Sequence, residues 1–282
     1  MTADLRLDLL GPLRGWADDR RIDLGPVRQQ ALLAVLAFRS NQVVSADELV
    51  DLVWSDAPPA SGARIVPPYI YRLRKLLPED VLVHSRDGYS LRLAPGALDL
   101  ARFEELVSAA HATQDSDEAA AKLSEALDLF TGDPLSGLAG HYLSVQRHRL
   151  TERRLKVLAE RIDLDLQRGR YGDLVPELVA LVDEDRLREQ FAGQLMLAYW
   201  RSGRVSEALD TYTRTRQELI EQPGVEPGPA LRPSTSRSCG PTRRLRPVRL
   251  SAMSFRTTVP RLSAVKSHCT RWSTHWPLRT TL

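Results

Sequence analysis

The sequence predicts an α+β N-terminal domain followed by an all-α domain, and three observations support this division. Apolar residues alternate with period two near the N-terminus and again at residues 81–93. From Asp99 onward they recur with the helical period instead. Near residues 169–212 the chain also matches itself at an offset of 34 residues. The length of 282 residues leaves room for about two domains.

Short antiparallel strands are predicted to open the chain. Residues 5–9 alternate strictly, and residues 21–24 follow a polar turn at residues 17–19. Gly25-Pro26 ends this region, and Pro26 suits the first position of a helix. The next stretch, Val27 to Arg39, is rich in alanine, leucine and valine, which indicates a helix largely buried in a core.

A second helix is predicted from a capping box after a brief extended segment at Val43-Val44. In residues 45–48 the Ser45 hydroxyl and the Glu48 carboxylate would each satisfy a backbone N–H of the other residue. We expect the apolar residues of this helix to face the core: Leu49, Leu52, Val53 and Trp54. The helix ends before the Pro58-Pro59 pair.

A third helix lies within residues 61–77, and a hairpin with its turn at residues 85–88 follows at 81–93. The helix contains Pro67-Pro68, so it either kinks there or effectively begins at Pro67, with residues 61–66 as a separate turn. We favour the second alternative. The spacing of four apolar residues predicts that they face the core: Val66, Ile70, Leu73 and Leu77.

The second region is predicted to contain helices at residues 101–112, 117–130, 142–169, 173–183, 187–202 and 205–220, with no strand. The self-match pairs Gly169 with Gly203 and Arg170 with Arg204. An offset of 34 residues is the tetratricopeptide period, in which paired helices stack and leave a groove for a partner. A plain helical bundle is the alternative.

Composition excludes several classes of protein. No phosphate-binding loop, zinc-protease histidine pair, Cys-x-x-Cys motif or nucleophile elbow occurs, so we expect no enzyme and no cofactor. His141 and His148 alone make an incomplete metal site. Two cysteines cannot form a disulfide scaffold. The sequence contains no run of about 18 apolar residues, the length that a membrane-spanning helix needs. The N-terminus lacks the pattern of a signal peptide, so a cytoplasmic location is expected.

The order of elements over the first 95 residues is that of a winged helix-turn-helix. The third helix has no acidic residue between Arg64 and Leu77, and it directs outward a basic and aromatic set: Arg64, Tyr71, Arg72, Arg74 and Lys75. Such a helix can enter the major groove of DNA, and Arg86 at the hairpin tip could reach the adjacent minor groove or backbone. A solvated basic helix face is the alternative.

The sequence resembles the antibiotic regulatory protein family, SARP, over about residues 5–232. In the first region the resemblance is carried by residues 43–45, 49–54, 69–77, 88–91 and 99–103. In the second it is carried by residues 132–135, 187–189, 195–204, 207–209 and 224–228. Members of this family join a winged helix of the response-regulator type to a helical, tetratricopeptide-like bacterial transcriptional activation domain.

The resemblance implies a transcriptional activator that binds direct repeats in promoters of secondary-metabolite (antibiotic) gene clusters and recruits RNA polymerase, usually as a homodimer on DNA. It implies a DNA-binding domain at residues 1–98 and an activation domain at 99–232. Matching positions imply DNA contacts by Arg64, Tyr69, Tyr71, Arg72 and Arg74, with Lys75 beside them and Arg86 on the wing. The rival hypothesis is a tetratricopeptide-like interaction scaffold with a degenerate winged helix. A small-molecule sensor is a third possibility.

The last 50 residues, 233–282, differ sharply from the rest. They carry ten Lys and Arg residues and no acid, whereas residues 1–232 hold 29 basic and 36 acidic residues, a net charge of −7. The basic residues of this tail are therefore the reason why the whole chain has a pI of about 9.0. Its composition suggests a GC-rich gene read out of frame, and the alternative is a disordered basic arm that strengthens non-specific DNA binding.

Overall fold

A computed structural model describes residues 5–55 and 57–221. The chain divides between residues 177 and 178 into two compact units. The expected tail at 233–282, with the question of its reading frame, lies outside the described residues. Within the described part, no helix is both long and apolar enough to cross a membrane.

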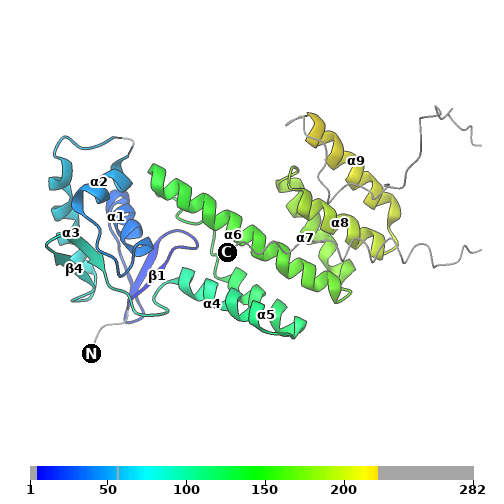
Figure 1. Cartoon of the computed structure of the whole chain (residues 1–282), viewed down its shortest axis with the longest axis horizontal. Helices are drawn as coiled ribbons and strands as arrows, with labels where there is room; N and C mark the ends of the chain where they lie inside the picture. The colour runs from blue at the N-terminus through cyan, green and yellow to red at the C-terminus, as the bar shows by residue number, and fades with distance from the viewer. Residues whose placement is uncertain (1–4, 56, 222–282) are drawn as a thin grey trace, which may run out of the picture. The chain divides into compact units, whose positions relative to one another are not determined.

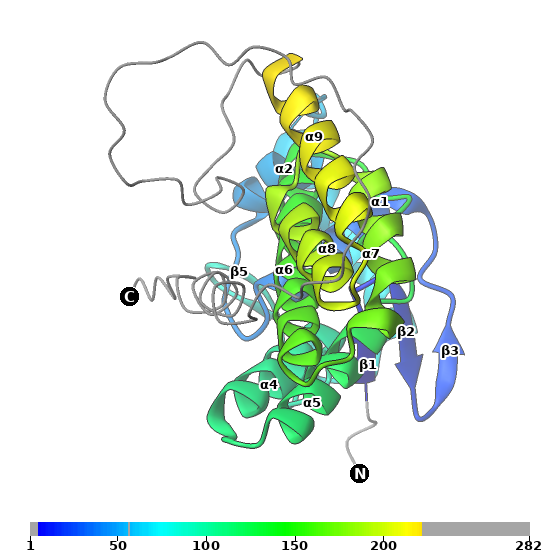
Figure 2. The ribbon, with the colours of Figure 1, turned by 90° about the vertical axis from the view of Figure 1, so that its right-hand side faces the viewer.

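The first unit opens with a three-stranded antiparallel sheet, visible in Figure 2, rather than with two strands. β1 (Leu5–Asp8) pairs with β2 (Arg14–Ala17), which pairs with β3 (Arg20–Ile22). Sequence periodicity missed β2 because Gly15 breaks the alternation of apolar side chains. Gly15 lies between Leu7 and Leu24, and a Cβ atom there would come within 3.1 Å of the Leu7 side chain. The middle strand thus contributes backbone, not a side chain, to the packing at that point.

Three helices follow the sheet, as predicted (Figure 1): α1 (Val27–Phe38), α2 (Ala46–Trp54) and α3 (Val66–Leu76). Pro26 has an extended backbone and precedes α1, so it is not the first helical residue. The Ser45 Oγ accepts the Glu48 N–H at 3.1 Å, which confirms one half of the predicted capping box. The Glu48 carboxylate lies 3.6 Å from the Arg39 guanidinium.

The proline pair sets the start of α3. A short 3₁₀ helix, η1 (Gly62–Ile65), forms a separate turn, and α3 then begins at Val66 with both prolines in its first turn. A proline there removes an N–H group that has no partner within the helix anyway. The favoured prediction is therefore confirmed to within one residue. The predicted core residues Val66, Ile70, Leu73 and Leu77 are all buried.

The wing is a hairpin of β4 (Leu82–Ser85) and β5 (Gly88–Leu91). The predicted extended segment at Val43-Val44 extends this small sheet, since the backbone of Val44 exchanges two hydrogen bonds of 2.8 Å with Tyr89. Gly88 has a φ of 147°, and a Cβ atom there would lie 2.1 Å from the Val44 carbonyl oxygen. Only glycine permits this close approach of the wing to the segment that leads into α2.

The helical part of the first unit shares its core with the winged helix. It contains the antiparallel pair α4 (Asp99–Ala112) and α5 (Ser116–Asp128), followed by the long α6 (His141–Gln167) (Figure 1). Leu10 packs among α4, α5 and α6, whereas Leu135, Leu138 and Leu143 belong to the core of the winged helix. The expected boundary between residues 98 and 99 therefore lies inside one compact unit.

The remaining helices are α7 (Tyr171–Glu184), α8 (Glu189–Arg201) and α9 (Val205–Glu221), and no strand follows β5 within the described residues. The offset of 34 residues has a structural counterpart in the turns after α6 and α8. Gly169 and Gly203 have φ values of 81° and 79°. The following N–H groups, of Arg170 and Arg204, donate to the carbonyl oxygens of Asp165 and Tyr199. Both turns thus end a helix with the same left-handed glycine closure.

Candidate nucleic-acid interface

The seven predicted DNA-binding residues lie on η1, α3 and the wing. Arg64 is exposed on η1, and Arg86 is exposed at the turn between β4 and β5. The other five lie on α3: Tyr69, Tyr71, Arg72, Arg74 and Lys75. Tyr71, Arg72, Arg74 and Lys75 are exposed, whereas Tyr69 is half-buried.

Tyr69 fixes one end of the basic face. Its ring packs against Trp54 of α2, with ring centroids 5.6 Å apart. The Arg72 guanidinium carbon lies 5.7 Å from the centroid of the same ring. A cation near an aromatic face is attracted by the ring quadrupole. Trp54 is buried, so the stack links an exposed arginine to the core through Tyr69.

A second cation–aromatic pair lies one turn further along α3. The Lys75 Nζ is 4.6 Å from the centroid of the Tyr71 ring. Tyr71 has 60% of its surface exposed, the second largest fraction among the exposed large apolar and aromatic residues of the described chain. The spacing of four residues places both side chains on one face of the helix.

Arg74 differs from its neighbours because its guanidinium is engaged within the protein. Its Nε donates to the Leu82 carbonyl oxygen at 3.0 Å, so it ties the C-terminal half of α3 to the first strand of the wing. Sequence reasoning grouped Arg74 with the outward cations, and no signal in the sequence revealed this contact with the wing. For Trp54, which supports Tyr69, the sequence pattern indicates only a core position.

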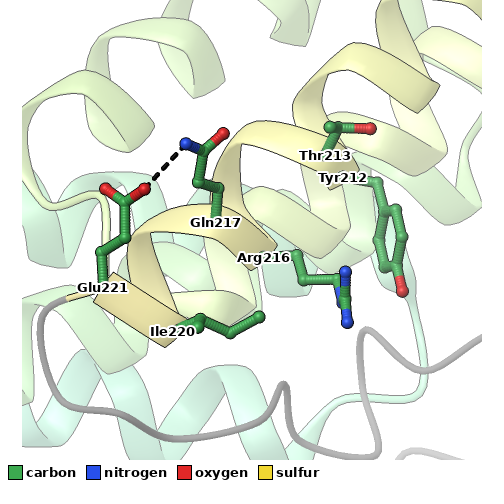
Figure 3. Close-up of a pocket in the computed structure, with 6 residues that line it drawn as sticks. All are labelled: Tyr212, Thr213, Arg216, Gln217, Ile220 and Glu221. Atoms are coloured by element: carbon green, nitrogen blue, oxygen red, sulfur yellow. Dashed lines mark hydrogen bonds between the residues drawn. The ribbon is translucent and has the colours of Figure 1, made fainter.

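The described residues contain no group of three or more His, Cys, Asp or Glu side chains arranged to hold a metal ion. A surface hollow along α9 is lined by Tyr212, Thr213, Arg216, Gln217, Ile220 and Glu221. Figure 3 shows that all six come from this one helix and that Gln217 donates to Glu221, at 2.8 Å. A hollow formed by a single helix does not enclose a ligand, so α3 and the wing remain the candidate site.

Comparison with known proteins identifies the families of both regions of the chain. Residues 19–91 match the family described as "Transcriptional regulatory protein, C terminal", and residues 98–237 match "Bacterial transcriptional activator domain". The fold and the exposed basic face thus define a winged helix-turn-helix protein with a helical activator-type domain. The chain belongs to the antibiotic regulatory protein family, SARP.

Individual relatives show how much of each protein the chain represents. It is 44% identical over 231 residues to Regulatory protein AfsR of Streptomyces coelicolor, covering 80% of this chain and 23% of the relative. It is 32% identical over 242 residues to Regulatory protein DnrI of Streptomyces peucetius, covering 80% of this chain and 89% of the relative. The chain therefore spans about a quarter of the AfsR protein and most of DnrI.

A solved structure shares the fold. The structure described as "Mycobacterium tuberculosis EmbR in complex with low affinity phosphopeptide" is 30% identical, with a TM-score of 0.76. The match covers 81% of this chain and 63% of the EmbR chain. The winged helix followed by a tetratricopeptide-like helical region is thus an arrangement that occurs in this family.

Proposed function

We propose that this protein is a transcriptional activator that binds double-stranded promoter DNA through α3 and the β4–β5 wing. One observation carries the proposal: the exposed face of α3 bears Arg72 and Lys75 beside Tyr71, with no acidic residue between Arg64 and Leu77. Residues 1–98 hold 12 basic and 12 acidic residues, so attraction to phosphates must come from this local cluster and not from net charge.

The structure suggests different roles within the proposed DNA-binding set. Arg72, Lys75, Arg64 and Arg86 are the exposed cations suited to phosphates and base edges. Tyr69 supports Arg72, and Tyr71 accompanies Lys75. Arg74 acts mainly by holding the wing against α3, and any contact that it makes with DNA is secondary to this.

The remaining parts of the proposal rest on family membership. Residues 99–232 carry 17 basic and 24 acidic residues, and we assign to them contact with RNA polymerase and pairing of protomers on direct repeats. We propose a pathway-specific regulator of a secondary-metabolite gene cluster that acts in the cytoplasm, without a cofactor and without catalysis.

The test is binding of the full chain to DNA from upstream of its own gene, at two salt concentrations. The ten basic residues at 233–282 attract DNA of any sequence. The measured quantity is therefore the ratio of the affinity for this fragment to the affinity for random-sequence DNA. We expect Arg72→Ala to lower the affinity for the fragment about tenfold and to reduce the salt slope by about one. Arg21→Ala, an exposed arginine on β3, is the matched control and should leave both unchanged.

A protein-interaction scaffold is the competing function. Three apolar side chains of α9 favour this function because they are 41–62% exposed: Val205, Leu209 and Ile220. An affinity ratio near one, with no effect of Arg72→Ala, would favour the scaffold. Strong selectivity lost in Arg72→Ala would exclude a degenerate winged helix.

A further inference from the structure

The N-terminal turn of α3 has almost no backbone donors to offer to DNA. Pro67 and Pro68 carry no N–H group, and the N–H of Val66 already donates to the Ala63 carbonyl oxygen of η1. A helix N-terminus usually binds phosphate through its free N–H groups. That contact is largely missing here, so the first turn of α3 must meet DNA with its side chains.

The side chains at this end of α3 are apolar and exposed. Pro67 and Pro68 are exposed, and the largely exposed Tyr71 lies four and three residues further along the helix. Tyr71 therefore lies beside both prolines on the exposed surface of α3, away from its buried residues, Val66, Ile70 and Leu73. The cations Arg72 and Lys75 lie in the second half of the helix.

In a helix-turn-helix protein the N-terminal residues of the recognition helix contact base edges in the major groove. The major-groove edge of guanine presents two acceptors, and that of cytosine presents a donor. Against prolines these groups would lose water without gaining a hydrogen bond, which is costly. Thymine also presents one acceptor, O4, but its 5-methyl group adds an apolar surface that suits the prolines.

Given the proposed function, we infer that Pro67, Pro68 and Tyr71 form a contact surface for thymine methyl groups. The surface sets the preferred base at the N-terminal end of α3, whereas the exposed cations Arg72 and Lys75 contact phosphates and base edges further along the site. The site that this protein selects therefore contains T·A pairs where the first turn of α3 meets the DNA.

The experiment uses the full chain and a duplex that it selects from a pool of random sequence, with unselected DNA as competitor. Each thymine of the selected site is replaced in turn by deoxyuridine, which differs only by the missing methyl group. Burial of one methyl group corresponds to about a fourfold change in affinity. We expect about fourfold weaker binding at one or two thymines in each half-site and no change at the others.

A double variant assigns the effect to the prolines. In Pro67→Ser/Pro68→Ser the difference between thymine and deoxyuridine should disappear at the same positions. Pro95→Ser changes an exposed proline in the turn before α4 and should keep the full difference. Tyr71→Ser should reduce it in part.

The outcomes separate this inference from the proposed function. If the protein selects a site but deoxyuridine has no effect anywhere, the thymine contact is wrong and DNA binding stands. If the effect persists in the double proline variant, another element reads the methyl groups, which also overturns the inference. If no sequence is selected, both the inference and the proposed function fail.

Discussion

The backbone N–H of Leu9 donates to the carboxylate of Asp99, with both oxygens 2.8 Å from the nitrogen. The N–H of Leu10 donates to the same group at 2.8 Å. Asp99 is the first residue of α4, and Leu9 follows β1, so a single side chain links the winged helix to the helical region. This link is one reason why both parts lie in one compact unit.

The pKa of Asp99 provides a pH test of this link. Burial raises its pKa from 3.8 to about 6, against the opposing effect of the backbone hydrogen bonds from Leu10 and Leu9. Between pH 3.8 and about 6 the folded protein therefore binds more protons at this residue than the unfolded chain does. The contribution of Asp99 to stability is full below this window and is lost as the pH rises through it.

We expect the free energy of unfolding of the wild type, relative to Asp99→Asn, to fall by about 2 kcal/mol as the pH rises from about 4 to about 6. Urea unfolding at several pH values, followed by tryptophan fluorescence, measures this difference. A difference that stays constant or grows with pH would show that burial does not dominate the titration of Asp99.

Gly88 is the position where a side chain should do most damage to the wing. Gly88→Ala places a Cβ atom against the backbone of Val44, which cannot move aside as a flexible side chain could. We expect a loss of stability of about 3 kcal/mol, seen as a lower Tm. Gly96→Ala is the control, because Gly96 also has a positive φ of 78° but no neighbouring atom within 4 Å. Equal losses for the two variants would mean that the approach to Val44 costs nothing.

Asp165 organises three arginines at the end of α6. It is 4% exposed and accepts hydrogen bonds from Arg161, Arg168 and Arg170 at 3.0–3.3 Å. Asp165→Asn would remove the buried negative charge that compensates these guanidiniums, of which that of Arg161 is the most buried. We expect it to lower the free energy of unfolding by about 3 kcal/mol in denaturant titrations.

Asp173 provides the matched control for Asp165. Its carboxylate lies 3.7 Å from the guanidinium of the same Arg170, but its side chain is 77% exposed. Asp173→Asn should therefore change stability by less than about 0.5 kcal/mol. If the two variants were equally stable, burial of Asp165 would not determine the strength of this network.

Arg72 and Arg74 should separate DNA binding from folding. Arg74→Ala removes the hydrogen bond to Leu82, so we expect a stability loss of about 1 kcal/mol as well as weaker DNA binding. Arg72→Ala should weaken DNA binding with a stability change below about 0.5 kcal/mol, since Arg72 is exposed. Thermal unfolding and DNA titration of both variants test this. A larger stability loss in Arg72→Ala than in Arg74→Ala would contradict the two roles.

Much of the fold followed from local patterns. The spacing of Val66, Ile70, Leu73 and Leu77 predicted the buried side of α3, and all four are buried. Pro67-Pro68 predicted that η1 and α3 are separate, because the missing N–H groups can be tolerated only in a first helical turn. The match of Gly169 with Gly203 predicted a tetratricopeptide-like repeat of helices, and the structure shows that both glycines end a helix with the same left-handed closure. Whether the seven predicted residues contact DNA stays a prediction.

By itself, the sequence determined the kinds of elements, their order and the family resemblance. These depend on side chains a few residues apart, whose spacing can be read directly from the chain. Only the tertiary structure decided that Gly15 lies in a middle strand, that Arg74 holds the wing, and that Asp99 bonds to Leu9, 90 residues away. Such contacts depend on the path of the whole chain, because the same aspartate or arginine would satisfy a local pattern equally well if it faced solvent.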